Sequence, residues 1–129
     1  MAATIRYKAG VSDPAKACRE IREAIAVAAS VWGEFVGDAG ELVVTSLNDG
    51  AHRPESYHGK GQAVDLRTSN LPNDAARRTA AKRLGARLGA TVELPVSNPL
   101  KYLLNLWRPD RKGYRVLLEA DHCHVEWRT

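Results

Sequence analysis

The sequence predicts an α+β fold in which a mainly antiparallel sheet packs against two or more helices. Segments with a helical spacing of apolar residues and segments with strand-like alternation both occur, and they do not follow each other in a regular β-α order. The chain has 129 residues, a length that suits one domain over 1–129.

Two helices are expected. The first begins near Asp13 and Pro14, because proline is tolerated in the first helical turn, and runs for about 22 residues. Its buried side is a stripe of apolar residues three or four positions apart: Cys18, Ile21, Ile25, Ala28, Trp32 and Phe35. The second helix is expected over 72–88, with its N-terminus near Asn73 or Asp74.

Short segments rich in β-branched residues or with alternating apolar residues predict the strands. They cover 42–46, 62–68, 91–94, 114–119 and 122–127. The last two are expected to form a hairpin around Ala120 and Asp121. The segment 97–112 is ambiguous, because Pro99 and Pro109 limit any helix between them.

Composition narrows the classes of partner. The net charge of +4 suits an anionic partner such as cell wall, nucleic acid or lipid head groups, but selects none of them. No uncharged apolar run approaches the roughly 18 residues of a membrane span, so no membrane insertion is expected. Residues 1–10 are not followed by the apolar stretch of a signal peptide, so we expect synthesis in a cytoplasm. There Cys18 and Cys123 are expected to be thiols, although a disulfide between them stays possible.

The histidines point to a metal. All four, His52, His58, His122 and His124, fall in two short segments that also carry acids. Imidazole is the commonest protein ligand of zinc. On a strand His122 and His124 share one face, while Cys123 points to the other. Two histidines and one carboxylate would leave one tetrahedral position open, as in catalytic rather than structural zinc sites.

The pattern Ser-x-His-x-x-Gly-x-Ala-x-Asp over 56–65, followed by His-x-His at 122–124, resembles the D-Ala-D-Ala carboxypeptidase and L-alanyl-D-glutamate endopeptidase family of zinc peptidases. Phage endolysins of this type have a similar length. The stretch 44–68 is also similar to the corresponding part of the hedgehog signalling domain, which shares the fold. The resemblance covers roughly 42–127 and implies a hedgehog/DD-peptidase-like fold.

The resemblance implies a role for each matching residue. His58, Asp65 and His124 match the ligands of one Zn²⁺ per chain. Asp121 matches the general base, and His122 matches a histidine that can stabilise the transition state. In the first block, His52 and Ser56 match positions near the metal where substrate binds, and Arg53 is the nearest candidate for an arginine that holds substrate carboxylate or polarises the scissile carbonyl.

The role of Asp121 depends on local geometry. On an ideal strand Asp121 faces away from His124, because three is an odd step. A turn or bulge at Asp121 is therefore needed, and Glu119 is the alternative base if there is none.

Together these residues predict a zinc peptidase that cuts peptidoglycan peptides, as a monomer released to the wall or carried in a phage particle. The alternative is a zinc-containing binding module of the hedgehog type, or a phage structural component, without activity. A nuclease is disfavoured, because no Asn and His at helical spacing follow the Asp121–His122 pair, so no nucleic-acid partner is expected.

Overall fold

The computed structural model describes residues 2–11, 13–37, 39–47, 57–94 and 112–129. Of the predicted site residues, His52, Arg53 and Ser56 lie outside this part, as does most of the ambiguous segment 97–112. In chain order the elements are β1 (Thr4–Tyr7), the 3-10 helix η1 (Pro14–Lys16), α1 (Arg19–Val36), β2 (Glu41–Ser46), β3 (Ala63–Arg67), α2 (Asp74–Leu88), β4 (Thr91–Glu93), β5 (Gly113–Leu118) and β6 (His122–Arg128).

The described strands form one six-stranded sheet with the order β1-β2-β3-β6-β5-β4. The α+β class is confirmed, and the sheet is mixed. Its three inner pairings are antiparallel, as the sequence predicted, and the β5–β6 hairpin is present. The two outer pairings, β1–β2 and β4–β5, are parallel. For β1 and β2 the reason is the connection, because α1 carries the chain back across the sheet between them.

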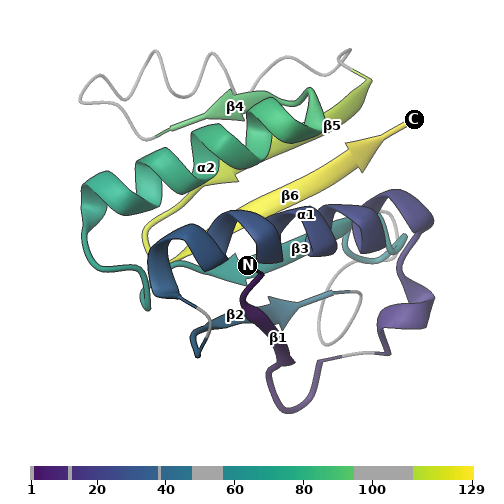
Figure 1. Ribbon diagram of the computed structural model, residues 1–129. Helices are drawn as coiled ribbons and strands as arrows, with labels where there is room; N and C mark the ends of the chain where they lie inside the picture. Colours follow the sequence, from purple (N-terminus) through teal and green to yellow (C-terminus); the bar gives the residue numbers. More distant parts are fainter. Residues whose placement is uncertain (1, 12, 38, 48–56, 95–111) are drawn as a thin grey trace.

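Both helices lie side by side on one face of the sheet (Figure 1). Alternate residues of the two central strands point into this layer: Val64 and Leu66 from β3, and Cys123 and Val125 from β6, all fully buried. Trp32 of α1 is also fully buried, and its indole Nε1 donates a hydrogen bond to the carbonyl of Arg67. The other set of alternate residues on β3 and β6 therefore faces away from the helices.

The first helix differs from the prediction. Instead of one helix from Asp13 onward, the chain forms the 3-10 turn η1, then two extended residues, Ala17 and Cys18, and only then α1. The amide of Cys18 donates to the carbonyl of Gly61 at 2.8 Å, which ties the start of α1 to the loop before β3. The predicted stripe from Ile21 to Trp32 is buried as expected.

The second helix follows the prediction closely. Asn73 is its N-cap and accepts a hydrogen bond from the amide of Ala76 at 2.8 Å. Gly89 ends the helix in the left-handed conformation. Strand β1 was not predicted, and its four residues are all exposed.

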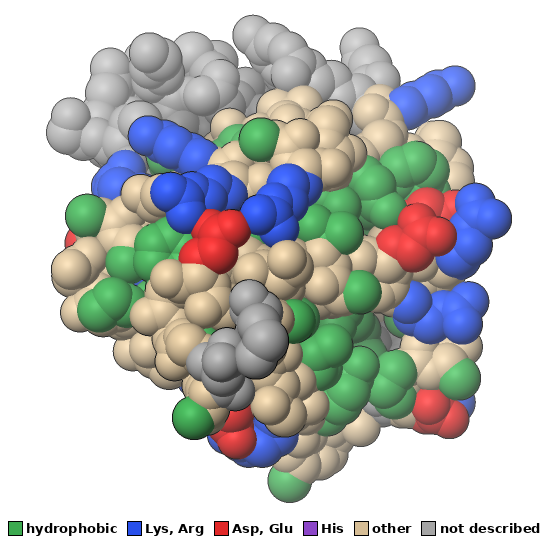
Figure 2. Space-filling model, in the orientation of Figure 1, with side chains coloured by type: hydrophobic (Ala, Val, Ile, Leu, Met, Phe, Trp, Pro, Cys, Tyr) green, Lys and Arg blue, Asp and Glu red, His purple; other side chains and the backbone are tan. Residues whose placement is uncertain are grey.

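The outer surface of the helices carries charged side chains among apolar ones (Figure 2). Figure 2 shows Lys and Arg side chains gathered on this face, interspersed with acids, and no described histidine is visible there. Arg83 and Arg87 of α2 both reach Glu34 of α1. Within the described residues, neither helix is long and apolar enough to cross a bilayer.

Candidate metal centre

Two of the three predicted ligands are brought together by strand pairing. Asp65 of β3 and His124 of β6 are directly opposite each other in the antiparallel ladder. Their neighbours Val64, Leu66, Cys123 and Val125 point into the core, so Asp65 and His124 must point to the opposite face. The burial of an apolar face therefore fixes the register that places these two side chains together.

The third predicted ligand, His58, comes from the loop before β3. Gly61 makes this loop possible: its φ is +71°, and a Cβ there would lie 2.6 Å from the carbonyl oxygen of Lys16. A side chain at this position would push the loop away from the start of α1. The loop also bonds to its neighbours, since His58 Nδ1 donates to the carbonyl of Leu47 at 2.6 Å.

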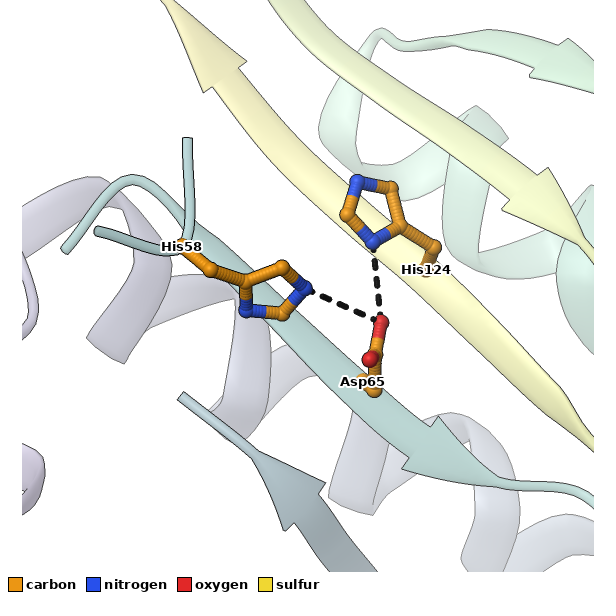
Figure 3. Close-up of side chains that lie close together, drawn as sticks. All are labelled: His58, Asp65 and His124. Atoms are coloured by element: carbon orange, nitrogen blue, oxygen red, sulfur yellow. Dashed lines mark hydrogen bonds and ion pairs between the residues drawn. The ribbon is translucent and has the colours of Figure 1, made fainter. Parts of the chain in front are cut away.

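The three side chains converge on one point (Figure 3). Each offers one donor atom, and these atoms all lie within 4.8 Å of one another. Asp65 Oδ1 is 3.4 Å from His58 Nε2 and 2.8 Å from His124 Nδ1. A tetrahedral zinc with ligands at about 2.0–2.2 Å sets its donor atoms roughly 3.3–3.5 Å apart. The distance from Asp65 to His58 fits such an ion, and the distance from Asp65 to His124 would fit it after a small opening.

The second nitrogen of each imidazole is held from outside the triad. His58 uses Nδ1 to reach Leu47, and His124 uses Nε2 to reach Glu126 Oε1 at 2.9 Å. Partners of this kind fix the orientation of metal-binding histidines and leave the other nitrogen for the metal. The donor set would therefore be His58 Nε2, a carboxylate oxygen of Asp65 and His124 Nδ1.

Glu126 is itself held by two arginines. Arg128 Nε donates to its Oε2 at 2.6 Å, and Arg115 Nη1 lies 3.7 Å from its Oε1. Arg115 also pairs with Glu93 at 2.6 Å. All four side chains are at most 12 % exposed, so this network is a firm support behind His124.

The charges of the triad are strongly coupled. Burial alone would raise the pKa of Asp65, but hydrogen bonds from His124 and His58 outweigh it and hold that pKa well below its usual range. Burial would lower the pKa of His124, whereas hydrogen bonds to Asp65 and Glu126 raise it to about 9. For Glu126, burial is outweighed by hydrogen bonds from His124 and Arg128, and its pKa falls to about 2. His124 is thus a cation between two carboxylates, and a metal ion at Nδ1 would replace its proton.

His122 and Asp121 lie next to the triad. His122 Nε2 is 3.9 Å from Asp65 Oδ1 and 3.1 Å from Glu119 Oε2, and its Nδ1 is 2.7 Å from Asp121 Oδ1. Asp121 lies in the bend before β6, so the turn that its predicted role requires is present. The hydrogen bond with His122 lowers the pKa of Asp121 and keeps this exposed carboxyl ionised. Glu119 contacts the same imidazole, so the geometry leaves both carboxylates as candidate bases.

A cleft of about 340 Å³ opens beside the triad. Asp65, Asp121 and His122 form part of its wall. Cys123, between the two histidines, lies on the helix-covered side, where burial raises the pKa of its thiol to about 12. Cys18 and Cys123 are both free thiols, as expected.

Sequence reasoning missed several residues around the triad. Glu126 was not singled out, although its position two residues after His124 places both on one face of a strand. Arg67 has the same relation to Asp65. The roles of Arg115 and Glu93 depend on contacts between strands, so no local sequence pattern predicts them.

Comparisons with known proteins add no evidence about this centre. No family model, no curated protein and no solved structure matches this chain.

Proposed function

We propose that the protein is a zinc-dependent peptidase that hydrolyses peptide bonds in the stem peptides of peptidoglycan. The proposal rests on the motif resemblance described above for the substrate class. For the metal chemistry it rests on one observation, the convergence of His58, Asp65 and His124 next to an open cleft.

The donor set favours zinc over calcium or magnesium. Two imidazoles and one carboxylate are typical of catalytic zinc, whereas the two lighter ions prefer oxygen ligands. Three protein ligands would leave a coordination position for substrate or water. When bound, zinc lowers the pKa of a coordinated water and polarises a carbonyl oxygen.

The remaining residues would divide the proton transfers. Asp121, ionised at neutral pH, would accept a proton from the attacking water and deliver it to the leaving amine. His122 would donate a hydrogen bond to the oxyanion that develops on the scissile carbonyl. The contact of its Nδ1 with Asp121 orients the ring, and its Nε2 would exchange Glu119 for the oxyanion. Glu119 is the alternative base.

Metal analysis and digestion of purified cell wall test the proposal together. The protein should contain close to one zinc per chain, and mass spectrometry of muropeptides should show cleaved stem peptides. Cleavage between L-Ala and D-Glu, which leaves L-Ala on the sugar and a free amine on D-Glu, would identify an endopeptidase, and loss of terminal D-Ala a carboxypeptidase. His58→Ala should lose both zinc and turnover.

Two matched variants assign the base. Asp121→Asn should keep zinc and lose turnover by about 100- to 10,000-fold, while Glu119→Gln should keep most of it. The reverse result would make Glu119 the base. Full zinc content with no turnover of any wall peptide would reject the peptidase and favour a zinc-containing binding module.

A further inference from the structure

One side of the cleft is basic. Beyond Asp65, Asp121 and His122, its wall includes Lys8, Arg67 and the hydroxyl residues Ser46 and Ser69. These residues come from different segments. Lys8 follows β1 and its amide bonds to the carbonyl of Val44, so its position at the sheet edge is fixed.

Arg67 differs from every other strand arginine of the described residues. Arg6, Arg115 and Arg128 each pair with a glutamate, at 2.8, 2.6 and 2.6 Å respectively. The guanidinium of Arg67 has no hydrogen bond or ion pair within the described part of the chain, although the residue is only partly exposed. Guanidinium groups that are partly removed from water usually have an anionic partner.

The position of Arg67 is set by the same pairing that builds the triad. It lies opposite His122 in the β3–β6 ladder, two residues from Asp65 on the same strand face. The amide of Thr68 donates to the carbonyl of Asp121 at 3.1 Å, which ties the end of β3 to the bend before β6. Strand pairing and this hydrogen bond therefore join Arg67 directly to the proposed catalytic residues.

The charge of the cleft wall depends on the metal. Lys8 and Arg67 balance Asp65 and Asp121 when no ion is bound. A divalent cation on Asp65 would leave the wall with an excess of positive charge. A peptide held there would be favoured if it carried an anion on the side of Lys8 and Arg67.

We propose that Lys8 and Arg67 form a subsite for a free carboxylate of the peptide substrate, next to the bond that is cut. The planar guanidinium of Arg67 matches a carboxylate in a bidentate way, and the ammonium of Lys8 adds a second charge. Ser46 and Ser69 border the same space with hydroxyl groups. The inference rests on the proposed function for the reacting bond, but the subsite itself is built from this chain's own residues.

Two carboxylates of stem peptides could occupy the subsite, and two pairs of synthetic peptides separate them. The first pair ends in D-Ala-D-Ala as the free acid or as the amide. The second pair carries D-Glu after L-Ala with its α-carboxyl free or amidated. The zinc-loaded protein should cut the free member of one pair better, mainly through KM, by about 10- to 100-fold.

The variants Lys8→Ala and Arg67→Ala should abolish this preference, and Arg67→Lys should restore part of it. Lys82→Ala is the matched control, because it removes one exposed positive charge from α2 on the helix side of the sheet. Circular dichroism and zinc content verify that each variant is folded. If Arg67→Ala and Lys82→Ala behave alike on free and amidated peptides, the subsite is rejected.

A binding measurement keeps the result independent of turnover. Calorimetry on zinc-loaded Asp121→Asn protein should give a lower Kd for N-acetyl-D-Ala-D-Ala, or for the L-Ala-D-Glu peptide, than for the corresponding amide. The difference should disappear with the added Arg67→Ala change. Discrimination in binding with no wall hydrolysis by the unchanged protein would reject the peptidase and keep the subsite. Hydrolysis with no discrimination would reject the subsite alone.

Discussion

The two faces of the sheet are built from the same strands and have opposite chemistry. On β3, Val64 and Leu66 are fully buried under the helices, while Asp65 and Arg67 point to the opposite face of the sheet. On β6, Cys123 and Val125 face the helices, and His122 and His124 face the cleft side. The apolar core and the candidate metal-binding side chains are thus separated by single residue steps. Substitutions at adjacent positions should therefore have effects of different kinds, and four experiments test this separation.

The largest effect is expected at Asp65, on the face away from the helices. Asp65→Asn removes the carboxylate that both His58 and His124 approach, so zinc affinity should fall by at least about 100-fold, more than for the loss of an outer partner. Competition with a chelating dye measures this loss. The far-ultraviolet circular dichroism should stay unchanged, because the side chain makes no contribution to the apolar core. A variant that unfolds would contradict the separation of the two faces.

Leu66→Ala, one residue further along β3, should act on stability instead. The side chain is fully buried, and removing it from such a core costs about 2–5 kcal/mol. Urea denaturation of the metal-free protein measures the change in the free energy of unfolding. Where the variant is still folded, its zinc affinity should stay within a few-fold of the original. A large loss of affinity would show that the faces are coupled.

The metal-free protein should lose stability as the pH rises above neutrality. The folded-state pKa of His124 is raised from 6.5 to about 9, so its contribution is complete below pH 6.5 and is lost as the pH rises through 9. The loss is on the order of 3 kcal/mol. Glu126 acts in the opposite sense, since its stabilisation is present above pH 4.5 and disappears as the pH falls through 2.

Thermal unfolding of chelator-treated protein between pH 5 and 10 measures this dependence. Asp65→Asn should flatten it, because the hydrogen bond from His124 to Asp65 contributes most to the raised pKa. A flat profile in the original protein would mean that His124 is neutral at pH 7 without metal.

The smallest of the four effects concerns the support behind His124. Glu126→Gln keeps an oxygen near Nε2 of His124 but removes the negative charge. Zinc affinity should fall by about 10-fold, the smaller end of the range for residues that hydrogen-bond to a metal ligand. Glu93→Gln is the matched control. Glu93 is about as buried as Glu126, and its ion pair is with Arg115 instead of His124. Equal losses in both variants would assign the effect to general disruption of the charged network.

The sequence predicts most of the central sheet from local patterns of apolar residues, and it predicts the triad through the resemblance of its two motif blocks to zinc peptidases. Strand alternation places His124 and Cys123 on opposite faces, and the dense motif around His58 and Asp65 includes Gly61, whose φ and close approach to Lys16 require glycine. The bend at Asp121 follows from the tendency of aspartate to occupy turns.

What sequence reasoning missed depends on contacts between distant segments. Strand β1 has no buried face, so no alternation reveals it, and its place is set by parallel pairing with β2. The break before α1 arises because Cys18 bonds to Gly61, more than forty positions away. The basic side of the cleft needs Lys8 and Arg67 together, and only the folded sheet brings them to one wall.

The pairing of Asp65 with His124 would give a bound metal ion a role in folding as well. Sliding β6 by a single position against β3 would turn both imidazoles of the strand toward the helices and bring a thiol to the open side. Only the aligned ladder brings the donor atoms of Asp65 and His124 together beside His58, so a metal ion bound by all three would stabilise that alignment. Zinc would then favour the correct register of β3 and β6 during folding.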